Sequence, residues 1–314
     1  MGLWRLRPAR SLSYLFSRGA TLRNWRPLFT MALVLDFDGT ITVQDTINVL
    51  AQSTLKIHRE RGRDLSRKWE EIVDLYVKSH AEFKANYPLA EDSRLDREAE
   101  SRYLASLRDV EVASVRRVEA SGIFDGISPQ DLFAAGTAAV RDGDVVLRDG
   151  LSELLSLAEA RGWPVYVLSV NWSKSFIRGV LHQFDGKLAV ISNEIHDGGR
   201  ILSPDTQTFL ATAGDKLEAF QAILRDVGPR RAVYFGDSTT DIECLLLYSG
   251  IVISSSEDSS LLRTLSRVGA TVPHVKGSAG TGTLLWARDF AEVIQAKTLL
   301  SPSVLGETHC ANNL

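Results

Sequence analysis

The sequence predicts an α/β fold in which a doubly wound parallel sheet carries an inserted all-helical cap domain. Short apolar runs rich in β-branched residues recur through the second half of the chain, and each is followed by a segment with helical periodicity. A long segment of helical texture separates the first such run from the others. The 314 residues, 44% of them hydrophobic, suffice for this core and a second domain.

Five strands are expected, and four of them are short and nearly all apolar, as in a parallel sheet that is covered on both faces. The expected strands are residues 33–37, 165–169, 189–192, 232–235 and 251–254. The expected helices of the same part of the chain are residues 151–161, 173–182, 216–227, 239–248, 259–268 and 284–296. This alternation of strand and helix is typical of a sheet built from βα units.

Residues 45–141 form the expected cap. Apolar residues recur there at helical spacing in two stripes, which are Leu65, Trp69, Ile72 and Tyr76, and then Tyr103, Leu107 and Val110. The segment is too long for a loop and contains no strand-like run. The core is therefore expected from residues 31–44 and 142–300, and residues 301–314 are expected to be a flexible tail.

The first 30 residues differ from the rest of the chain in charge. They contain six arginines and no acidic residue, with Leu12, Leu15 and Phe16 at helical spacing. A basic, acid-free segment of this kind predicts a mitochondrial transit peptide, and hence a place in the mitochondrial matrix. The alternative is that translation starts at Met31, directly at the first strand, which would leave the protein in the cytoplasm.

Composition argues against several classes of partner and site. The net charge is −3 although the first 30 residues are basic, so the remainder is acidic and is not expected to bind nucleic acid or an anionic membrane surface. No run approaches the roughly 18 apolar residues that a membrane span needs. The two cysteines, Cys244 and Cys310, support neither a disulfide framework nor a thiolate metal site.

Two carboxylates end the first expected strand, in the segment LDFDGT at residues 35–40. Side chains alternate along a strand, so Asp36 and Asp38 should project to one face. Open α/β sheets bind ligands at the carboxyl ends of their strands, which is where this pair falls. An acidic turn is the simpler alternative. A calcium loop fails on spacing, because Ile41 and Ile47 occupy the positions of its glycine and its bidentate glutamate.

A second acidic cluster, GDSTTD at residues 236–241, follows the expected strand 232–235 and opens a helix. Asp237 or Ser238 could simply cap that helix. Capping does not explain why both strands end in aspartate. If the two strands lie side by side, Asp36 and Asp237 converge into an oxygen-only site suited to Mg²⁺, and the ion would remove the repulsion between them.

Two further positions could complete a phosphate site. Ser169 ends an expected strand with a hydroxyl, and the turn at residues 170–172 presents backbone N–H groups at a helix start, where anions bind. Lys216, at the start of another helix, can supply a cation to a phosphate and to an attacking carboxylate. A serine at a strand end is usually a cap and a surface lysine is usually solvated, but together with the aspartates they favour a phosphate site.

With these segments in this order, the chain resembles the haloacid dehalogenase-like hydrolase superfamily. Residues 36–40 are similar to its first motif, Ser169 to its second, Lys216 to its third, and residues 236–241 to its fourth. A cap inserted after the first motif is similar to the phosphoserine-phosphatase-like branch. The resemblance implies a Rossmann-like core.

The resemblance also implies a role for each motif residue. Asp36 would be the nucleophile that forms an aspartyl-phosphate, and Asp38 would protonate the leaving alkoxide and then deprotonate water. Mg²⁺ would be held by Asp36, the main-chain carbonyl of Asp38, and Asp237. The remaining implied residues are Asp241 and Ser238, which would orient the metal ligands, and the phosphate-binding set Thr40, Ser169, Asn171 and Lys216.

The functional hypothesis is a Mg²⁺-dependent phosphatase that acts on a small phosphomonoester. The resemblance associates an acid at position 38 with phosphatases and phosphomutases, and a cap that closes over the site favours a small phosphorylated metabolite over a phosphoprotein. A phosphotransferase or phosphomutase with the same intermediate is one alternative. A non-catalytic metabolite-binding protein of the same fold is another.

Departures from the family pattern bear on the substrate. Phosphoserine phosphatases usually carry two glycines after the second-motif serine and an asparagine before the last aspartate of the fourth motif. This chain has Val170, Asn171 and Thr240 at those positions, which disfavours phosphoserine. The turn at residues 169–173 and the cluster at residues 236–238 are more similar to phosphatase modules that act on vitamin phosphates such as thiamine monophosphate.

Overall fold

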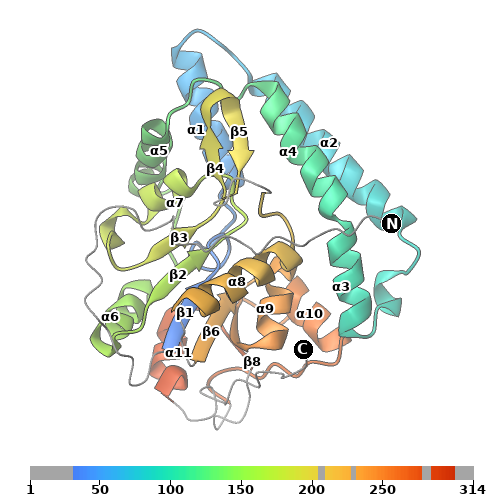
Figure 1. Ribbon diagram of the computed structural model, residues 1–314, viewed down its shortest axis with the longest axis vertical. Coiled ribbons are helices and arrows are strands. Elements are labelled where there is room, and N and C mark those ends of the chain that lie inside the picture. The colour runs from blue at the N-terminus through green and yellow to red at the C-terminus, as the bar shows by residue number, and fades with distance from the viewer. Residues whose placement is uncertain (1–30, 204–208, 228–230, 278–283, 301–314) are drawn as a thin grey trace, which may run out of the picture.

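A six-stranded parallel sheet forms the centre of the computed structural model, which describes residues 31–203, 209–227, 231–277 and 284–300 (Figure 1). The strand order is β3-β2-β1-β6-β7-β8, and every neighbouring pair is parallel. The strands are β1 Met31–Leu35, β2 Val165–Leu168, β3 Ala189–Ile191, β6 Arg231–Gly236, β7 Ser249–Ile253 and β8 Leu284–Ala287. This Rossmann-like α/β sheet confirms the predicted fold class.

Helices connect and cover the strands. The helices that follow residue 150 are α6 Leu151–Arg161, α7 Lys174–Val180, α8 Ala213–Val227, α9 Ile242–Leu247, α10 Ser260–Arg267 and α11 Phe290–Gln295. The helices between β1 and residue 142 are α1 Ile47–Glu60, α2 Ser66–Asn86, α3 Arg97–Ser106, α4 Arg108–Ser121 and α5 Pro129–Asp142. Single 3-10 turns occur at Glu91–Ser93, His182–Phe184, Asp197–Gly199, Thr239–Asp241 and Thr298–Leu300.

The alternation of side chains along the strands divides the core into two layers. In β1, Leu33 and Leu35 belong to one buried apolar cluster, whereas Ala32 and Val34 belong to a second cluster. Helices α6, α7 and α11 contribute to the first cluster, and α8, α9 and α10 contribute to the second. All five residues of β1 are buried because helices cover both faces of the sheet, which is therefore doubly wound.

The position of β1 in the sheet determines where a ligand site can form. β1 pairs with β2 on one side and with β6 on the other. The strands that follow β1 in the sequence are therefore added first on one side of it and later on the other side. Such a change of direction opens a crevice at the carboxyl ends of the two central strands. The segments that follow β1 and β6 are the two aspartate-containing motifs.

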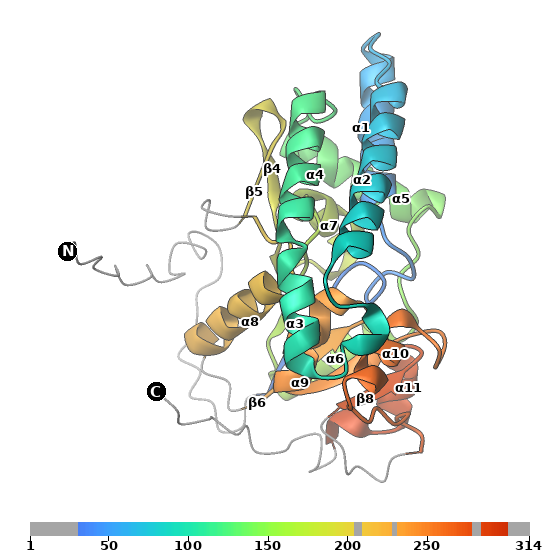
Figure 2. The same cartoon turned by 90° about the vertical axis from the view of Figure 1, so that its right-hand side faces the viewer.

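Residues 45–141 contain helices α1 to α5 and no strand. Helices α2 and α4 run side by side and rise beyond the sheet, whereas α3 lies against the core (Figure 2). Arg108 at the start of α4 pairs with Asp215 of α8, with 2.5 Å between Nη1 and Oδ1, and Arg97 of α3 pairs with Glu243 of α9 at 2.8 Å. The helical content agrees with the expected cap, and the division into cap and core stays a prediction.

One predicted helix is wrong in its first half. The sequence predicts a single helix over residues 284–296, but the structure has β8 at Leu284–Ala287 and α11 at Phe290–Gln295. The apolar run of β8 pairs with β7, and Asp289 caps the new helix by accepting a hydrogen bond from the backbone N–H of Glu292 at 2.8 Å. Pairing with a buried strand outweighs helical periodicity over so short a run. An antiparallel hairpin of β4 Glu194–His196 and β5 Arg200–Leu202 was also not among the predicted elements.

Two predictions about the ends of the chain lie outside the described residues. The expected transit peptide occupies residues 1–30, and the expected tail occupies residues 301–314. Within the described part of the chain, no helix has both the length and the apolar character that crossing a membrane requires.

Candidate active site

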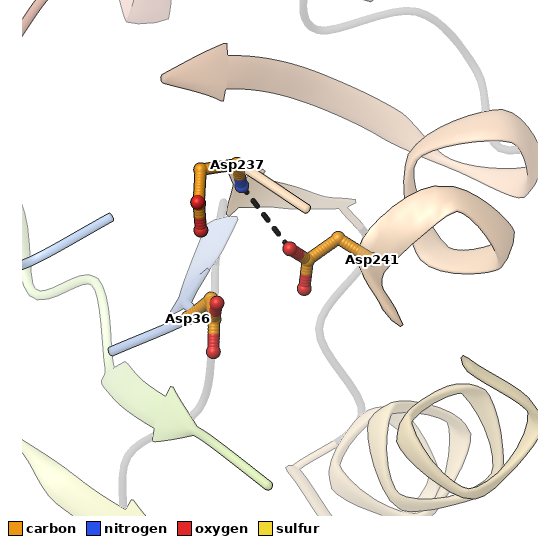
Figure 3. Close-up of side chains that lie close together, drawn as sticks. All are labelled: Asp36, Asp237 and Asp241. Carbon is orange, nitrogen blue, oxygen red and sulfur yellow. Dashed lines mark hydrogen bonds between the residues drawn. The ribbon is translucent and has the colours of Figure 1, made fainter. Parts of the chain in front are cut away.

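The carboxyl ends of β1 and β6 bring three aspartates together. β1 and β6 pair in register, with Leu35 opposite Phe235, and the backbone N–H of Asp36 donates to the carbonyl oxygen of Phe235 at 2.9 Å. Asp36 follows β1 and Asp237 follows β6, so adjacent parallel strands deliver both carboxylates to one edge (Figure 3). One carboxylate oxygen from each of Asp36, Asp237 and Asp241 lies within 4.8 Å of the other two.

A buried lysine lies against this acidic cluster. The side chain of Lys216, on α8, is fully buried, and its Nζ lies 2.7 Å from Oδ1 of Asp36 and 2.6 Å from Oδ1 of Asp241. Lys216 Nζ also donates to Oγ1 of Thr240 at 3.3 Å, and the hydroxyl of Tyr234 donates to Oδ1 of Asp241 at 2.7 Å. One ammonium group therefore serves a cluster of three carboxylates.

The pKa values reflect an excess of negative charge in this cluster. Burial raises the pKa of Asp36 well above its ordinary value, and the neighbouring carboxylate of Asp241 raises it further. Burial and the same carboxylate raise the pKa of Asp237 to about 7. Burial alone would lower the pKa of Lys216, but Asp241 and Asp36 outweigh it and raise that pKa. At Asp36 and Asp237, burial and the neighbouring carboxylate together outweigh the lowering effect of Lys216.

This electrostatic environment and the donor set fit a hard divalent cation. The cluster offers only oxygen ligands, which Mg²⁺ prefers, and a divalent cation would compensate the negative charge that Lys216 leaves uncompensated. Both oxygens of Asp241 already accept hydrogen bonds. Oδ1 accepts from Lys216 and Tyr234, and Oδ2 accepts from the backbone N–H groups of Asp237 and Ser238 at 3.1 Å each. Asp36 and Asp237 are therefore the better placed carboxylate ligands.

The first-motif loop reaches this cluster because it contains a glycine. Gly39 has a φ of +75°, and a Cβ at this position would collide with the carboxylate of Asp237. The adjacent Thr40 donates its hydroxyl to Oδ1 of Asp237 at 3.0 Å. Arg148 holds the loop from outside, because its guanidinium donates to the carbonyl oxygens of Gly39 and Thr40.

Asp38 lies in a separate hydrogen-bond network. Its Oδ1 accepts from the backbone N–H of Thr46 at 2.8 Å and from the hydroxyl of Thr46 at 2.6 Å, and its Oδ2 accepts from Nδ2 of Asn171 at 2.9 Å. Burial and then the charge of Asp45 raise the pKa of Asp38 to about 6. A carboxyl group with a pKa close to neutral suits general acid and base catalysis.

The second-motif residues connect to Asp38. The side-chain amide of Asn171 donates to Asp38 and to Thr46, and its Oδ1 accepts from the backbone N–H of Ser173 at 3.1 Å. The backbone N–H of Asn171 donates to Oγ of Ser169 at 3.0 Å. Both Ser169 and Asn171 are almost completely buried. Asn171 is predicted to bind phosphate, and in this structure its side chain positions Asp38.

A cavity of about 550 Å³ lies above these groups. The predicted site residues that line it are Asp36, Asp38, Ser169, Asn171, Asp237 and Ser238. Lys216, Thr40 and Asp241 are not among the lining residues and contact the site from behind, through Asp36 and Asp237. Residues of α2 and α4 form the opposite wall. The predicted residues thus surround one cavity between the sheet edge and the helical segment.

Sequence reasoning missed three residues that hold the site. Thr46 binds Asp38, Tyr234 binds Asp241, and Arg148 holds the first-motif loop. The sequence does indicate Tyr234, because a hydroxyl-bearing side chain lies there in the middle of an otherwise apolar expected strand. It does not indicate Thr46 or Arg148, since threonines and arginines of this kind are common in surface segments.

Comparison with known proteins agrees with this arrangement. Residues 33–246 match the family model of haloacid dehalogenase-like hydrolases. A CTO1 family protein of Schizosaccharomyces pombe is 31% identical over 254 residues, which cover 76% of this chain and 86% of the relative. The bifunctional TH2 protein, mitochondrial, of Arabidopsis thaliana is 27% identical over 273 residues, which cover 79% of this chain and 43% of that longer protein.

Solved structures with a similar fold include a substrate-bound phosphoserine phosphatase complex, with 14% sequence identity and a TM-score of 0.48 over 86% of this chain and 99% of that one. A cytosolic 5′-nucleotidase IIIB bound to cytidine matches at 15% identity and a TM-score of 0.46, over 86% of this chain and 84% of that one. The family match and the identity of the fission-yeast relative decide the assignment. The chain therefore belongs to the haloacid dehalogenase-like hydrolase family.

Proposed function

We propose that this protein is a Mg²⁺-dependent phosphatase that hydrolyses a small phosphomonoester through an aspartyl-phosphate intermediate. One observation carries the proposal. The carboxylate of Asp36 lines the cavity while the buried ammonium of Lys216 and a second aspartate, Asp237, lie directly beside it. A carboxylate that attacks a phosphate dianion needs positive charge at this place.

The residues of the site would divide the reaction between them. Asp36 would attack phosphorus, and Asp38 would give its proton to the leaving alkoxide as the bond from phosphorus to the ester oxygen breaks. Asp38 would then take a proton from the water that attacks the aspartyl-phosphate, which releases inorganic phosphate and restores Asp36. Ser169 and Lys216 would hold the non-bridging oxygens of the phosphoryl group, with Thr40 and Asn171 supporting the same site.

Asp36, Asp237 and the main-chain carbonyl of Asp38 would hold the Mg²⁺ ion. When bound, Mg²⁺ would supply positive charge that offsets the charge of the phosphoryl group. Asp241 would orient these ligands, because the hydrogen bonds that it accepts tie Lys216 and the backbone of Asp237 into one network. Ser238 would act in the same way, since its hydroxyl donates to Oδ2 of Asp241 at 3.3 Å.

Hydrolysis of p-nitrophenyl phosphate with Mg²⁺ or with EDTA tests the proposal. We expect Mg²⁺-dependent turnover in the wild type and a loss of about 10⁴-fold in Asp36→Asn, the order of effect that follows removal of a covalent nucleophile. Asp185→Asn is the matched control, because its side chain is 79% exposed and does not line the cavity. Equal rates in wild type and Asp36→Asn would refute the mechanism.

The same experiment separates the alternatives. A phosphotransferase or phosphomutase would form the aspartyl-phosphate but transfer the group to an added alcohol faster than to water. A non-catalytic metabolite-binding protein would give no turnover with any phosphomonoester while still binding one. Asp36, Asp38, Ser169 and Asp237 line the cavity and Lys216 pairs with Asp36 from behind, which favours an active enzyme over a binding protein.

We further propose a vitamin phosphate such as thiamine monophosphate as the first substrate to test. The likeness of residues 169–173 and 236–238 to phosphatase modules for vitamin phosphates supports this choice. The cavity of about 550 Å³ is also of a size that suits a small ligand. A screen of phosphorylated metabolites that ranks kcat/KM would establish the preference, and activity confined to sugar phosphates would contradict it.

For location, we propose import into the mitochondrial matrix, with a cytoplasmic form if translation starts at Met31. The basic, acid-free segment at residues 1–30 supports import. The name of the Arabidopsis thaliana relative describes that protein as mitochondrial. Mass spectrometry of the mature N-terminus in cells provides the test, and an intact Met1 would contradict import.

A further inference from the structure

The cavity has a second wall that the proposed chemistry does not use. It consists of two carboxylates and three aromatic side chains, which we call the acidic-aromatic wall: Asp45, Trp69, Tyr76, Glu111 and Trp172. Trp69 and Tyr76 come from α2 and Glu111 comes from α4, so the helical segment supplies most of this wall. It faces the side of the cavity where the alcohol part of a phosphomonoester would lie.

Within the part of the chain that the structure describes, no cationic side chain pairs with the carboxylates of this wall. Among the described residues that line the cavity, none is lysine, arginine or histidine. Glu111 accepts a hydrogen bond from the hydroxyl of Tyr76 at 3.1 Å, and Asp45 accepts one from the backbone N–H of Ile47 at 2.9 Å. Neither carboxylate forms an ion pair within the described part of the chain. The wall therefore has negative charge that a ligand could neutralise.

The surroundings of Glu111 make its charge costly. Its side chain is partly buried on α4, next to the apolar cavity residues Val115 and Ile72. Burial raises the pKa of Glu111, and the hydrogen bond from the hydroxyl of Tyr76 offsets only part of this rise. Arg117, six residues further along α4, has buried Nε and Nη2 atoms without a hydrogen-bond partner among the described residues, but it is not among the residues that line the cavity.

The aromatic rings of the wall are held in place. Trp69 and Trp172 meet edge to face, with ring centroids 6.4 Å apart and an interplanar angle of 84°. Trp172 makes a second edge-to-face contact with Phe124 at 6.2 Å. Nε1 of Trp69 donates to Oδ1 of Asn48 at 3.2 Å, which limits rotation of that ring. Tryptophan and tyrosine rings that line one cavity together with carboxylates form a site that attracts organic cations.

We propose that the acidic-aromatic wall selects phosphomonoesters whose alcohol part carries a positive charge, and that it disfavours those that carry a carboxylate. The inference rests on the proposed phosphatase function and names the substrate class of the same site. The phosphate would lie against Asp36 and Ser169, and the cationic group would lie between Glu111 and the rings of Trp69 and Trp172.

Matched aryl phosphates test this selection. The probes are 4-(trimethylammonio)phenyl phosphate, its uncharged isostere 4-tert-butylphenyl phosphate, and 4-carboxyphenyl phosphate. Their leaving groups differ in intrinsic reactivity, so the measured quantity is the ratio of kcat/KM for the cationic and the uncharged probe, compared between variant and wild type. We expect this ratio to fall about tenfold in Glu111→Gln, mainly through KM, because one charge of the cation site is lost.

The matched control is Glu70→Gln, an exposed glutamate on α2 that does not line the cavity. Its ratio should equal that of the wild type. An unchanged ratio in Glu111→Gln would overturn the inference. So would a wild type that prefers 4-carboxyphenyl phosphate and loses this preference in Arg117→Met, because Arg117 would then be the charge that selects the substrate. If Glu111→Gln does not fold, Tyr76→Phe removes the hydrogen bond to Glu111 and should change the same ratio in the same direction.

A binding measurement separates this inference from the proposed function. Trp69 and Trp172 report ligands by fluorescence, so the free phenols that correspond to the cationic and uncharged probes can be titrated without turnover. If the wild type hydrolyses none of the probes but binds 4-(trimethylammonio)phenol more tightly than the uncharged phenol, the proposed phosphatase function is refuted and the selectivity of the acidic-aromatic wall is supported. Turnover of all three probes with equal binding of both phenols would support the chemistry and refute the wall.

Discussion

Two buried acidic sites of this protein differ in how many cationic side chains pair with their carboxylates. At Glu292 of α11, a single carboxylate lies 2.9 Å from Nζ of Lys276 and 3.0 Å from Nε2 of His274, and it accepts from the backbone N–H of Arg288 at 2.9 Å. At the cavity, the ammonium of Lys216 pairs with two carboxylates of a cluster of three, those of Asp36 and Asp241. The first site has two cationic side chains, Lys276 and Arg288, for one carboxylate, whereas in the second site one ammonium pairs with two carboxylates.

The pKa values of the two sites shift in opposite directions. Burial acts to raise the pKa of Glu292, but the backbone N–H of Arg288 and the side chains of Lys276 and His274 outweigh it and lower that pKa to about 2. At the cavity, burial and the charge of Asp241 raise the pKa of Asp237 to about 7. The carboxylate of Glu292 is satisfied within the fold, whereas the cluster at the cavity has the raised pKa values expected of a site that a cation and a substrate would complete in the proposed reaction.

The largest expected effect comes from removing the ammonium of the cavity site. Lys216→Met should lower p-nitrophenyl phosphate turnover by about 10³-fold or more, because the charge beside Asp36 is lost. It should also lower the free energy of unfolding by about 3 kcal/mol, since Asp36 and Asp241 would be left without their buried partner. Turnover and urea denaturation measure the two effects. Lys174→Met is the control, and a Lys216→Met enzyme within tenfold of wild type would contradict the comparison.

Loss of the Glu292 carboxylate should affect the stability of the protein and leave its catalytic rate unchanged. Glu292→Gln should lower the free energy of unfolding by about 2 kcal/mol, because His274 and Lys276 lose their charged partner. Catalytic rates per folded molecule should stay unchanged. Glu159→Gln, which breaks an exposed ion pair with Lys187, should cost less than about 0.5 kcal/mol in the same urea denaturation experiment. A similar cost in both variants would remove the distinction between the two acidic sites.

Removing one carboxylate from the crowded site should stabilise the metal-free protein. In EDTA, Asp237→Asn should raise the free energy of unfolding by about 1 kcal/mol, because the repulsion between Asp237 and Asp241 is relieved. The asparagine can still accept the hydrogen bond from Thr40. Thermal unfolding in EDTA measures the change, and Mg²⁺-dependent turnover should be lost in the same variant. A destabilised Asp237→Asn protein in EDTA would show that the cluster is not strained.

The smallest expected effect is a pH dependence of the Glu292 contribution. The pKa of Glu292 is lower in the folded protein than in the unfolded chain, so its contribution is fully present above pH 4.5 and is lost as the pH falls toward 2. The difference in stability between wild type and Glu292→Gln should therefore narrow by about 1 kcal/mol between pH 7 and pH 3.5. Urea denaturation at the two pH values tests this. A difference that widens on acidification would have the wrong sign.

Local signals account for the parts of the fold that were predicted. The apolar runs of β1, β2 and β6 each end in a residue that is not apolar, and this boundary is visible in the sequence. The prediction of a helix at the position of β8 was wrong because Leu284–Ala287 is a short apolar run that becomes a strand by pairing with β7. Periodicity alone cannot distinguish a helix from a strand in so short a run. The hairpin of β4 and β5 has strands of three residues each, too short for a recognisable pattern.

The residues of the candidate site also fall into a group that local sequence signals predicted and a group that they did not. Asp36, Asp38, Ser169, Lys216 and Asp237 were predicted because each stands at the end of a strand or the start of a helix. Residues that hold them were not predicted, because their partners are remote in the chain. The hydrogen bond from Asn171 to Asp38 spans 133 positions, and that from Arg148 to Thr40 spans 108. The role of Asp36 as nucleophile and of Asp38 as acid and base stays a prediction until the variants are measured.

By itself, the sequence determined the alternation of strands and helices, the helical segment after the first strand, and the types of residue at the strand ends. These features depend on apolar periodicity and on residues within a few positions of one another. Only the tertiary structure decided that Lys216 lies between Asp36 and Asp241, and that Glu111 lines a cavity to which no described lysine, arginine or histidine contributes. Such contacts join segments that pack together across the fold, and no local pattern encodes which charges will meet there.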